Sequence, residues 1–327
     1  MNRVFSFSVT VVCFVVNSLV FAQFAPIVGQ SGTTAMYKDS SAFVGWATAC
    51  HVVKGLQDVS APSNGYTNVG DSTMALGIAG SNGVVSLGDG GYAIMRFTSP
   101  ITDGVGPDLA VFENGFDDSF LELAFVEVSS NGIDFFRFPA TSNTDTTVQT
   151  GSFGLTDATK LNNLAGKYRA LYGTPFDLSD IPNTSLLNKQ AITYVKVIDV
   201  VGCIQNQYCS RDKDNHKVND PWPTAFGSSG FDLDAVGVIH QQPVGIDELE
   251  LAQVVAFPNP VTNEITIVTE LESYSVTITS LLGQEVLVLN VADRVSRIDV
   301  SSLHQGVYTI TIRSNNKQRV IKMVKGL

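Results

Sequence analysis

Two acidic loops contain the residues best suited to chemistry, and that chemistry is the binding of a hard cation. The segment from Asp103 to Asp108 is rich in glycine and lies just before an apolar stretch that ends in Glu113. Ca²⁺ needs several oxygen ligands on a chain that can curl around it, and loops of Asp, Asn and Gly supply both. Asp103 and Asp108 are therefore candidate metal ligands.

The second acidic loop runs from Asp212 to Asp220. Asp212, Asp214 and Asp220 match the first, third and ninth positions of a Ca²⁺-binding loop. His216 stands at the fifth position, where Asp or Asn is usual, and the sixth position has no Gly. Because the match is partial, solvated turn residues are the alternative. Ca²⁺ is the one cofactor that the sequence predicts.

Trp222 follows this loop and lies between two prolines. A rigid loop lowers the ordering cost of binding, so Trp222 is a candidate platform for a sugar or another flat ligand. A cap over the end of the fold is the alternative. Trp46 is assigned to the core.

The spacing of Cys203 and Cys209 predicts a disulfide that closes one loop. Disulfides persist in the oxidising compartments that exported proteins enter. The loop entropy of such a bridge contributes about 2 kcal/mol. Cys50 is then left as a buried thiol.

Catalytic motifs are absent from the sequence, which has no Gly-x-Ser-x-Gly elbow, no His-Glu-x-x-His and no phosphate-binding loop. Paired carboxylates are the one catalytic route, because Glu113, Glu122 and Glu127 lie on or beside expected strands and a glycosidase needs two acids. Glu122 and Glu127 have opposite parity along a strand and so point to opposite faces. The residues favour a binding protein over an enzyme. A glycoside hydrolase and a purely structural surface protein are the alternatives.

The elements that must position these residues are strands. The 327 residues are 44% apolar and 16% charged and include 28 glycines, which suits strands joined by tight turns. Asn131-Gly132 predicts a hairpin between strands at 120–128 and 133–138. The segment 156–172 is either helical or irregular. The pattern predicts an all-β chain, with a large jelly-roll-like β-sandwich followed by a small immunoglobulin-like β-sandwich.

The termini and the charge restrict location and partners. A net charge of −11 disfavours nucleic acid and anionic lipid as partners, because both are polyanions. Arg3, an apolar run and small residues before Gln23 predict a signal peptide over 1–22, with a membrane anchor as the alternative. No later segment is apolar enough to span a bilayer. The predicted organisation is the signal peptide, a cargo domain over 23–240, a linker over 241–253 and a C-terminal domain over 254–327.

Four features of the C-terminal domain occur in a set order: a Pro-Asn-Pro entry, a Leu-Gly turn, a Leu-x-x-Gly-x-Tyr strand and a basic last strand. The residues concerned are Pro258, Asn259, Pro260, Gly283, Gly306, Tyr308, Lys322 and Lys325. This order resembles the type A sorting domain of type IX secretion cargo. The resemblance implies the type IX secretion machinery as a partner, with passage through the periplasm to the outer-membrane surface or the exterior.

Each of these residues also has an expected physical role. The prolines keep a strand from extending back into the linker. Gly306 permits a tight turn before Tyr308. Lys322 and Lys325 protect an exposed edge strand from pairing with other chains.

Two further resemblances concern the cargo domain. The run 230–238 resembles the last strand of galactose-binding-like jelly rolls, and this resemblance makes Asp234 a ligand of a structural Ca²⁺. Residues 46–239 resemble an uncharacterised domain of secreted and cell-surface proteins, through runs such as 86–91 and 111–114. Distant relatives of that domain are linked to nutrient capture. The expected function is therefore an exported, Ca²⁺-stabilised binding or adhesion protein whose ligand is a glycan or a small nutrient.

Overall fold

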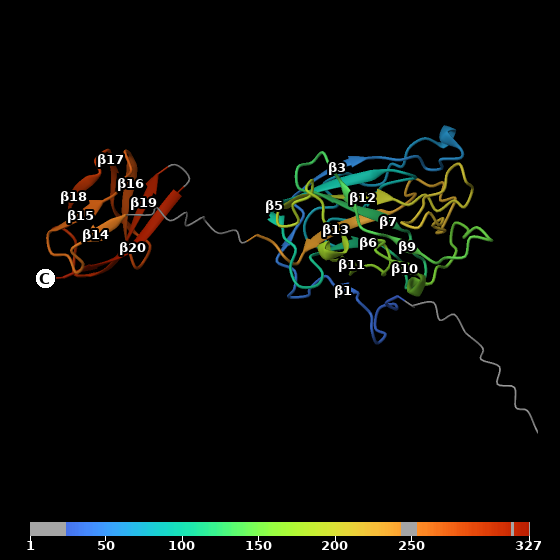
Figure 1. Cartoon of the computed structure of the whole chain (residues 1–327), viewed down its shortest axis with the longest axis horizontal. Helices are drawn as coiled ribbons and strands as arrows, with labels where there is room; N and C mark the ends of the chain where they lie inside the picture. The colour runs from blue at the N-terminus through green and yellow to red at the C-terminus, as the bar shows by residue number, and fades with distance from the viewer. Residues whose placement is uncertain (1–23, 243–253, 315–316, 327) are drawn as a thin grey trace, which may run out of the picture. The chain divides into compact units, whose positions relative to one another are not determined.

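The computed structural model of the chain describes residues 24–242, 254–314 and 317–326. The predicted signal peptide and residues 243–253 of the predicted linker lie outside them. The described residues form strands and loops with three short 3-10 helices, so the predicted all-β class is confirmed. The chain divides into two compact units, residues 1–242 and 243–327 (Figure 1), and each contains its own hydrophobic core.

The larger unit is built on two antiparallel sheets. The first contains β1 (Met36–Tyr37), β2 (Gly45–Trp46), β4 (Val85–Ser86), β6 (Leu109–Glu113), β11 (Tyr172–Phe176) and β13 (Asp232–Val238). The second contains β3 (Ala49–Val53), β5 (Tyr92–Ile101), β7 (Ala124–Ser129), β8 (Phe136–Arg137) and β12 (Ile192–Asp199). A separate pair is formed by β9 (Thr141–Ser142) and β10 (Leu161–Asn162).

The order of the strands is that of a jelly-roll-like sandwich. The first sheet runs β1-β11-β6-β13-β2, with β4 also paired to β13, and the second runs β3-β5-β12-β7-β8. The long strands β5, β6, β7, β11, β12 and β13 therefore alternate between the two sheets. Figure 1 shows β3, β12 and β7 lying over β13, β6 and β11. The predicted sandwich is confirmed.

Apolar side chains fill the space between the sheets and also cover the outer face of the first sheet. The inner core includes Met95, Val111, Val126, Val197 and Val236. On the outer face, Phe112 packs against the rings of Phe43 and Trp46, with centroids 5.6 and 5.4 Å away. Covering both faces explains why β6 and most of β13 are fully buried and read as continuous apolar runs.

The predicted hairpin is confirmed between β7 and β8, where Val128 lies opposite Phe136. Gly132 adopts a φ of 76°, and the Asn131 side chain accepts hydrogen bonds from the backbone amides of Ile133 and Asp134. The segment 156–172 is mostly irregular, with only the 3-10 helix η2 (Ala158–Lys160), the short strand β10 and the first residue of β11, and its apolar side chains fill a satellite core. The other 3-10 helices are η1 (Pro62–Asn64) and η3 (Leu178–Asp180).

The predicted disulfide is absent from this structure, in which Cys203 and Cys209 are both free thiols. The amide of Cys209 donates to the carbonyl of Gln205, so the loop coils into a turn. The Cys203 sulfur accepts a hydrogen bond from the Gln205 amide, and the Cys209 thiol donates to the Asn206 carbonyl. Each sulfur therefore has its own backbone partner, and hydrogen bonds hold the loop in place of a covalent bond.

The smaller unit is a seven-stranded sandwich. One sheet contains β14 (Val255–Phe257), β15 (Glu264–Val268) and β18 (Val295–Asp299). The other contains β17 (Glu285–Val291), β16 (Tyr274–Ser280), β19 (Gly306–Ser314) and β20 (Lys317–Lys325), in that order. Alternating residues such as Ile265, Ile267, Val276 and Ile310 form the core, and this confirms the small immunoglobulin-like sandwich.

Candidate functional site

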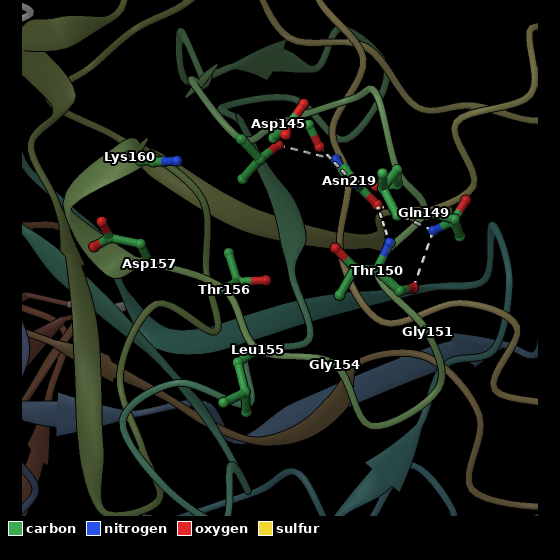
Figure 2. Close-up of a pocket in the computed structure, with 12 residues that line it drawn as sticks. Asp145, Gln149, Thr150, Gly151, Gly154, Leu155, Thr156, Asp157, Lys160 and Asn219 are labelled. Atoms are coloured by element: carbon green, nitrogen blue, oxygen red, sulfur yellow. Dashed lines mark hydrogen bonds between the residues drawn. The ribbon is translucent and has the colours of Figure 1, made fainter.

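A polar pocket of about 410 Å³ opens in the larger unit between the loop 144–160 and Asn219. Twelve residues line it: Thr144, Asp145, Val148, Gln149, Thr150, Gly151, Gly154, Leu155, Thr156, Asp157, Lys160 and Asn219. Figure 2 shows Thr156, Asp157 and Lys160 on one side and Asn219 with Gln149 on the other. The volume falls in the range of small-molecule sites.

Hydrogen bonds of the Asn219 side chain fix one wall of the pocket. Its amide nitrogen donates to the carbonyls of Asp145 and Val148, at 2.6 and 2.8 Å. Its oxygen accepts from the Thr150 amide at 2.9 Å and from the Gln149 side chain at 3.0 Å (Figure 2). Because Asn219 is buried and these four bonds converge on one loop, the wall is pre-formed.

The polar side chains of the lining differ in whether their hydrogen bonds are satisfied within the protein. Asp157 caps η2 by accepting hydrogen bonds from the amide and hydroxyl of Thr159. Asp145 accepts two hydrogen bonds from Thr147, which lower the pKa of its carboxyl. The Thr156 hydroxyl is buried and has no hydrogen-bond partner among the described residues. A buried hydroxyl without a hydrogen-bond partner is costly, so this group is an unsatisfied polar atom in the wall of the pocket.

Four phenylalanines form a continuous row beside the pocket, and we call Phe116, Phe120, Phe153 and Phe226 the aromatic row. Successive ring centroids are 5.6, 6.2 and 5.9 Å apart, and successive rings are inclined by 34°, 29° and 31°. Phe116, Phe153 and Phe226 are 80%, 72% and 47% exposed. Phe153 lies between Gly151 and Gly154, which both line the pocket. Exposed apolar patches of this kind mark binding surfaces.

Trp222 is not the predicted platform. Its side chain is only 7% exposed, and its indole nitrogen donates to a carboxylate oxygen of Asp89 at 3.1 Å. It packs with Val201 and Cys203 under the loops. The alternative assignment, a cap over the end of the sandwich, is the one that the structure supports.

The two predicted ligands of the first acidic loop lie close together, and a third carboxylate from another segment joins them. Oxygens of Asp103, Asp108 and Asp177 lie within 4.8 Å of one another. Asp108 is fully buried, accepts hydrogen bonds from the amides of Gly104 and Leu178, and lies 2.7 Å from the His240 ring nitrogen. Asp177, which the sequence reasoning did not single out, also caps η3.

The second acidic loop brings together Asp212, Asp214 and His216, also within 4.8 Å. Asp212 accepts hydrogen bonds from the amides of Asp214, His216 and Ser142. Asp220 is in neither cluster, because its carboxylate accepts the buried Leu123 amide.

Asp234 also lies apart from both clusters. Its two oxygens accept the Gly80 amide, and burial raises the pKa of its carboxyl to about 6. Asp220 and Asp234 therefore do not join the other predicted ligands.

Six buried carboxylates that are scattered along the sequence form a seam that was not predicted as a group. Asp89, Asp199, Asp220, Glu122, Glu113 and Asp232 influence one another electrostatically. Burial holds the pKa of Asp199 and Asp220 well above the usual range, and neighbouring carboxylates raise both further. Backbone amides of Phe231 and Gly90 donate to Asp199. Only the topology brings these scattered residues to one place.

Of the three candidate glycosidase acids, Glu127 lies apart from Glu113 and Glu122, and none of the three lines the pocket. Glu127 lies on β7 and pairs with Arg137 at 2.8 Å. Glu113 and Glu122 are electrostatic neighbours, but the Glu113 side chain is only 2% exposed and neither residue lines the pocket. A substrate in the pocket therefore does not meet this pair.

In the smaller unit, Asn259 ties the entry to the last strand. Its side chain donates to the Lys322 carbonyl at 2.7 Å and accepts the Val324 amide at 2.8 Å. The Tyr308 hydroxyl donates to the His304 carbonyl. Lys322 lies exposed on the edge strand β20, as predicted.

The structure differs from three of the physical roles predicted for residues of the C-terminal domain. The strand β14 ends at Phe257, so Pro258 and Pro260 end a strand of the domain itself. Gly306 has no positive φ and begins β19 opposite Lys325, so the chain needs no special conformation there. The Lys325 side chain is buried and so does not shield the edge.

Residues 255–326 match the model of the secretion system C-terminal sorting domain. This match confirms the predicted type IX sorting domain and shows that the chain is addressed for secretion or for attachment at the cell surface. No helix among the described residues has the length and apolarity needed to cross a membrane. No curated protein sequence matches the chain.

Solved structures resemble the chain weakly. PorZ, described as an essential bacterial surface component of the type-IX secretion system of Porphyromonas gingivalis, is 18% identical over 29% of this chain and 14% of its own, with a TM-score of 0.21. A β-glucuronidase from Ruminococcus gnavus is 10% identical over 89% of this chain and 48% of its own, with a TM-score of 0.25. The apo structure of this enzyme is 12% identical over 89% of this chain and 47% of its own, with a TM-score of 0.24. The chain spans about half the length of that enzyme.

Proposed function

We propose that the chain is an exported binding or adhesion protein whose larger unit recognises a neutral, polyhydroxylated ligand, a glycan or a small nutrient. The aromatic row beside the polar pocket is the observation that carries this proposal. Apolar faces of a sugar ring stack on aromatic rings, while its hydroxyls need donors and acceptors such as Thr156, Asp157 and Lys160. Sites of this kind combine apolar walls with a few placed polar groups. The net charge of −11 disfavours a polyanionic ligand.

Hydrolysis is less well supported than binding. A glycosidase needs an acid whose pKa is raised beside a second carboxylate. In the pocket, the Asp145 carboxyl has a lowered pKa, and the Asp157 carboxylate is engaged by Thr159. The carboxyls with raised pKa values, in the buried seam and at Asp103 and Asp234, all lie outside the lining of the pocket.

The test is a glycan array probed with residues 23–327, followed by calorimetry with the strongest ligand. Phe153→Ala and Phe226→Ala are expected to weaken binding about tenfold each, a loss of about 1.4 kcal/mol. Both side chains are exposed, so the unfolding midpoint should hardly change. Tyr37→Ala is the matched control, because Tyr37 is 42% exposed but lies on β1, away from the aromatic row.

Thr156→Val provides a sharper test. Because the Thr156 hydroxyl has no hydrogen-bond partner among the residues that the structure describes, its removal should leave stability equal or higher while weakening the binding of a sugar. Loss of stability without loss of affinity would assign the hydroxyl to the fold. Failure of every glycan and small nutrient to bind would leave the purely structural surface protein as the better description.

The same proposal includes stabilisation by Ca²⁺ at the two carboxylate clusters. Support comes from ligand atoms that already lie within 4.8 Å of one another, three carboxylate oxygens in the first cluster and two carboxylate oxygens with a His216 ring nitrogen in the second. One ion with ligand distances of about 2.4 Å can bridge that spacing. EDTA should lower the unfolding midpoint of the larger unit, and Asp103→Asn or Asp214→Asn should each reduce that effect. An unchanged midpoint would remove calcium from the proposal and leave the glycan site untouched.

A further inference from the structure

The second sheet of the larger unit, with the strands β3, β5, β12, β7 and β8, has one face toward the core and one face outward. Residues such as Met95 and Val197 point into the core, so the alternate residues of these strands point outward. Among the outward side chains, those of His51, Arg96 and Arg137 are exposed. This face is therefore accessible to a ligand.

Strand pairing places the charged side chains of this face next to one another. Arg96 on β5 lies opposite Tyr194 on β12. Two residues further along β12, Lys196 lies opposite Glu127 on β7, which in turn lies opposite Arg137 on β8. Neighbouring strands are about 4.8 Å apart, so the three cations follow one another across the sheet.

Each of these cations lies over an aromatic ring. The Arg96 guanidinium is 5.5 Å from the ring centroid of Tyr194, and the Lys196 ammonium is 4.5 Å from that of Tyr92. Arg137 makes the same kind of contact with a buried ring. Such contacts hold long side chains in place, so less conformational entropy is lost when they bind a ligand. We call Tyr92, Arg96, Arg137, Tyr194 and Lys196 the cationic face.

The positive charges of the cationic face exceed the negative charge beside them. The outward residues of the five strands include three cations and one carboxylate, that of Glu127. Glu127 accepts a hydrogen bond from Arg137 at 2.8 Å and lies 3.9 Å from the Lys196 ammonium. The Arg96 guanidinium makes no salt bridge with any residue that the structure describes. This face is thus locally cationic on a chain whose net charge is −11.

The chemistry of these side chains suits a polymer that carries both carboxylates and sugar rings. The planar fork of an arginine matches the two oxygens of a carboxylate. Tyr92 and Tyr194 are half-buried and offer apolar ring surface between the cations. Repulsion from acidic residues elsewhere in the chain is weak here, because the Debye length is about 8 Å at physiological ionic strength.

A polysaccharide fits the cationic face better than a nucleic acid does. Duplex DNA carries one negative charge per about 1.7 Å of its axis, and three cations neutralise few of these charges. A polysaccharide with at most one carboxylate per sugar has a lower charge density, so a protein with a net charge of −11 repels it less. The sorting domain also addresses the chain to the cell surface or the exterior, where extracellular polysaccharides occur.

We propose that the cationic face binds a carboxylated polysaccharide that lies across β5, β12, β7 and β8. Arg96 and Lys196 pair with its carboxylates, and Tyr194 packs against a sugar ring. None of the residues of the cationic face lines the polar pocket or belongs to the aromatic row. The site therefore takes an anionic polymer where the pocket takes a neutral ligand, and it does not rest on the proposed function.

Calorimetric titration of residues 23–327 with polygalacturonate tests the site. EDTA is present throughout, so that Ca²⁺ cannot bridge the polymer to the acidic loops. The methyl ester of the same polymer has the same backbone without the charge, and it should bind at least tenfold more weakly. NaCl at about 1 M, where the Debye length is about 3 Å, should abolish the binding of polygalacturonate.

Two variants assign the binding to named residues. Arg96→Gln and Lys196→Gln should each weaken the binding of polygalacturonate about tenfold. The unfolding midpoint of Arg96→Gln should hardly change, because the side chain is exposed. Lys38→Gln is the matched control, since the Lys38 ammonium also lies over a tyrosine ring, at 5.9 Å, but beside β1 of the first sheet.

Several outcomes would overturn the site. These are equal affinity for polygalacturonate and its methyl ester, full affinity in both variants, or no binding of either polygalacturonate or alginate, a second carboxylated polymer. A single-stranded oligonucleotide that binds as tightly as polygalacturonate would overturn the assignment to a polysaccharide. Phe153→Ala should leave the binding of polygalacturonate unchanged, and its loss in that variant would show that the cationic face is not a separate site.

Discussion

At the scale of single residues, several side chains that the sequence offers for function serve the fold. Asp108, Asp220 and Trp222 are polar or amphipathic groups in loops, yet all three are buried and hydrogen-bonded. Burial of a polar atom is tolerated only when a partner is present. The loops that contain these residues cover the sandwich and do not extend freely into solvent.

Trp222 should therefore behave as a structural residue. We expect Trp222→Phe to lower the free energy of unfolding by about 1–3 kcal/mol, because Asp89 loses a donor inside the protein. Trp222→Ala should cost about 3–5 kcal/mol, since a cavity is added. Urea unfolding measures both. A stable Trp222→Ala variant that loses ligand would restore the platform assignment.

The buried Lys167 makes the free energy of unfolding depend on pH. Burial lowers the pKa of its ammonium from 10.5 to about 8, and the ammonium donates to the Leu161 carbonyl. The unfolded chain binds more protons than the folded one between these values. Stability from this group is therefore complete above about pH 10.5 and is lost as the pH falls through about 8.

The comparison is with Lys167→Met, which lacks the titrating group. The difference in free energy of unfolding between the parent and this variant should grow in favour of the parent as the pH rises from 8 to 10. Its full size is at most about 3 kcal/mol. A difference that stays constant over this range would contradict the depressed pKa.

At the scale of elements, the candidate site depends on how loops are anchored to strands. The loop 144–160 is shaped by Asn219, and the loop 114–121 by its attachment to β6 and β7. Phenylalanines from the loop 114–121, from the stretch Gly151–Gly154 and from the region near Trp222 meet to form the aromatic row. No single loop contains the site.

Asn219→Ala should loosen the pocket. Four hydrogen bonds to the loop are lost and their buried partners are left unsatisfied, so we expect a destabilisation of about 2–4 kcal/mol. Hydrogen exchange should become faster at the amide of Thr150, which donates to Asn219. Unchanged exchange there would show that other contacts hold the wall. Asn188→Ala, in another loop, is a suitable control.

At the scale of the whole molecule, the two units have separate cores and separate tasks. The core of the larger unit is shared by its two sheets, and the smaller unit has its own core of Ile, Val and Tyr side chains. The smaller unit carries the sorting match, and the larger carries the pocket and the aromatic row. Each unit therefore has the requirements of an independently folding domain.

Deletion of residues 255–327 should separate these tasks. We expect the shortened chain to fold with the same unfolding midpoint as the larger unit of the parent, because no core residue is removed from it. Export should fail, with the product retained in the periplasm. Fractionation of the producing cells measures this, and secretion of the shortened chain at the parental level would contradict the role of the sorting domain.

Periodicity and short motifs were enough to predict the class of fold. Short apolar runs between turns predicted the strands of the larger sandwich, and alternating apolar positions predicted those of the smaller one. Asn131-Gly132 predicted the β7–β8 hairpin, and the ordered motifs from Phe257 onward predicted the sorting domain. These features are local, since strand alternation and turn chemistry depend on neighbours in sequence. For the same reason, the acidic loops could be recognised as segments that curl around a centre.

Only the tertiary structure decided what gathers at the site. The cations of the cationic face become neighbours through the pairing of β5, β12, β7 and β8, and the phenylalanines meet through three separate connections. Burial is likewise a property of the packed molecule, so the sequence could not show that Trp222 and Asp220 would lie inside or that Phe153 would remain outside. The sequence by itself determined the strands, the turns and the address for export, because those depend on local periodicity and motif. Long-range packing determined which polar and aromatic groups remained free to bind.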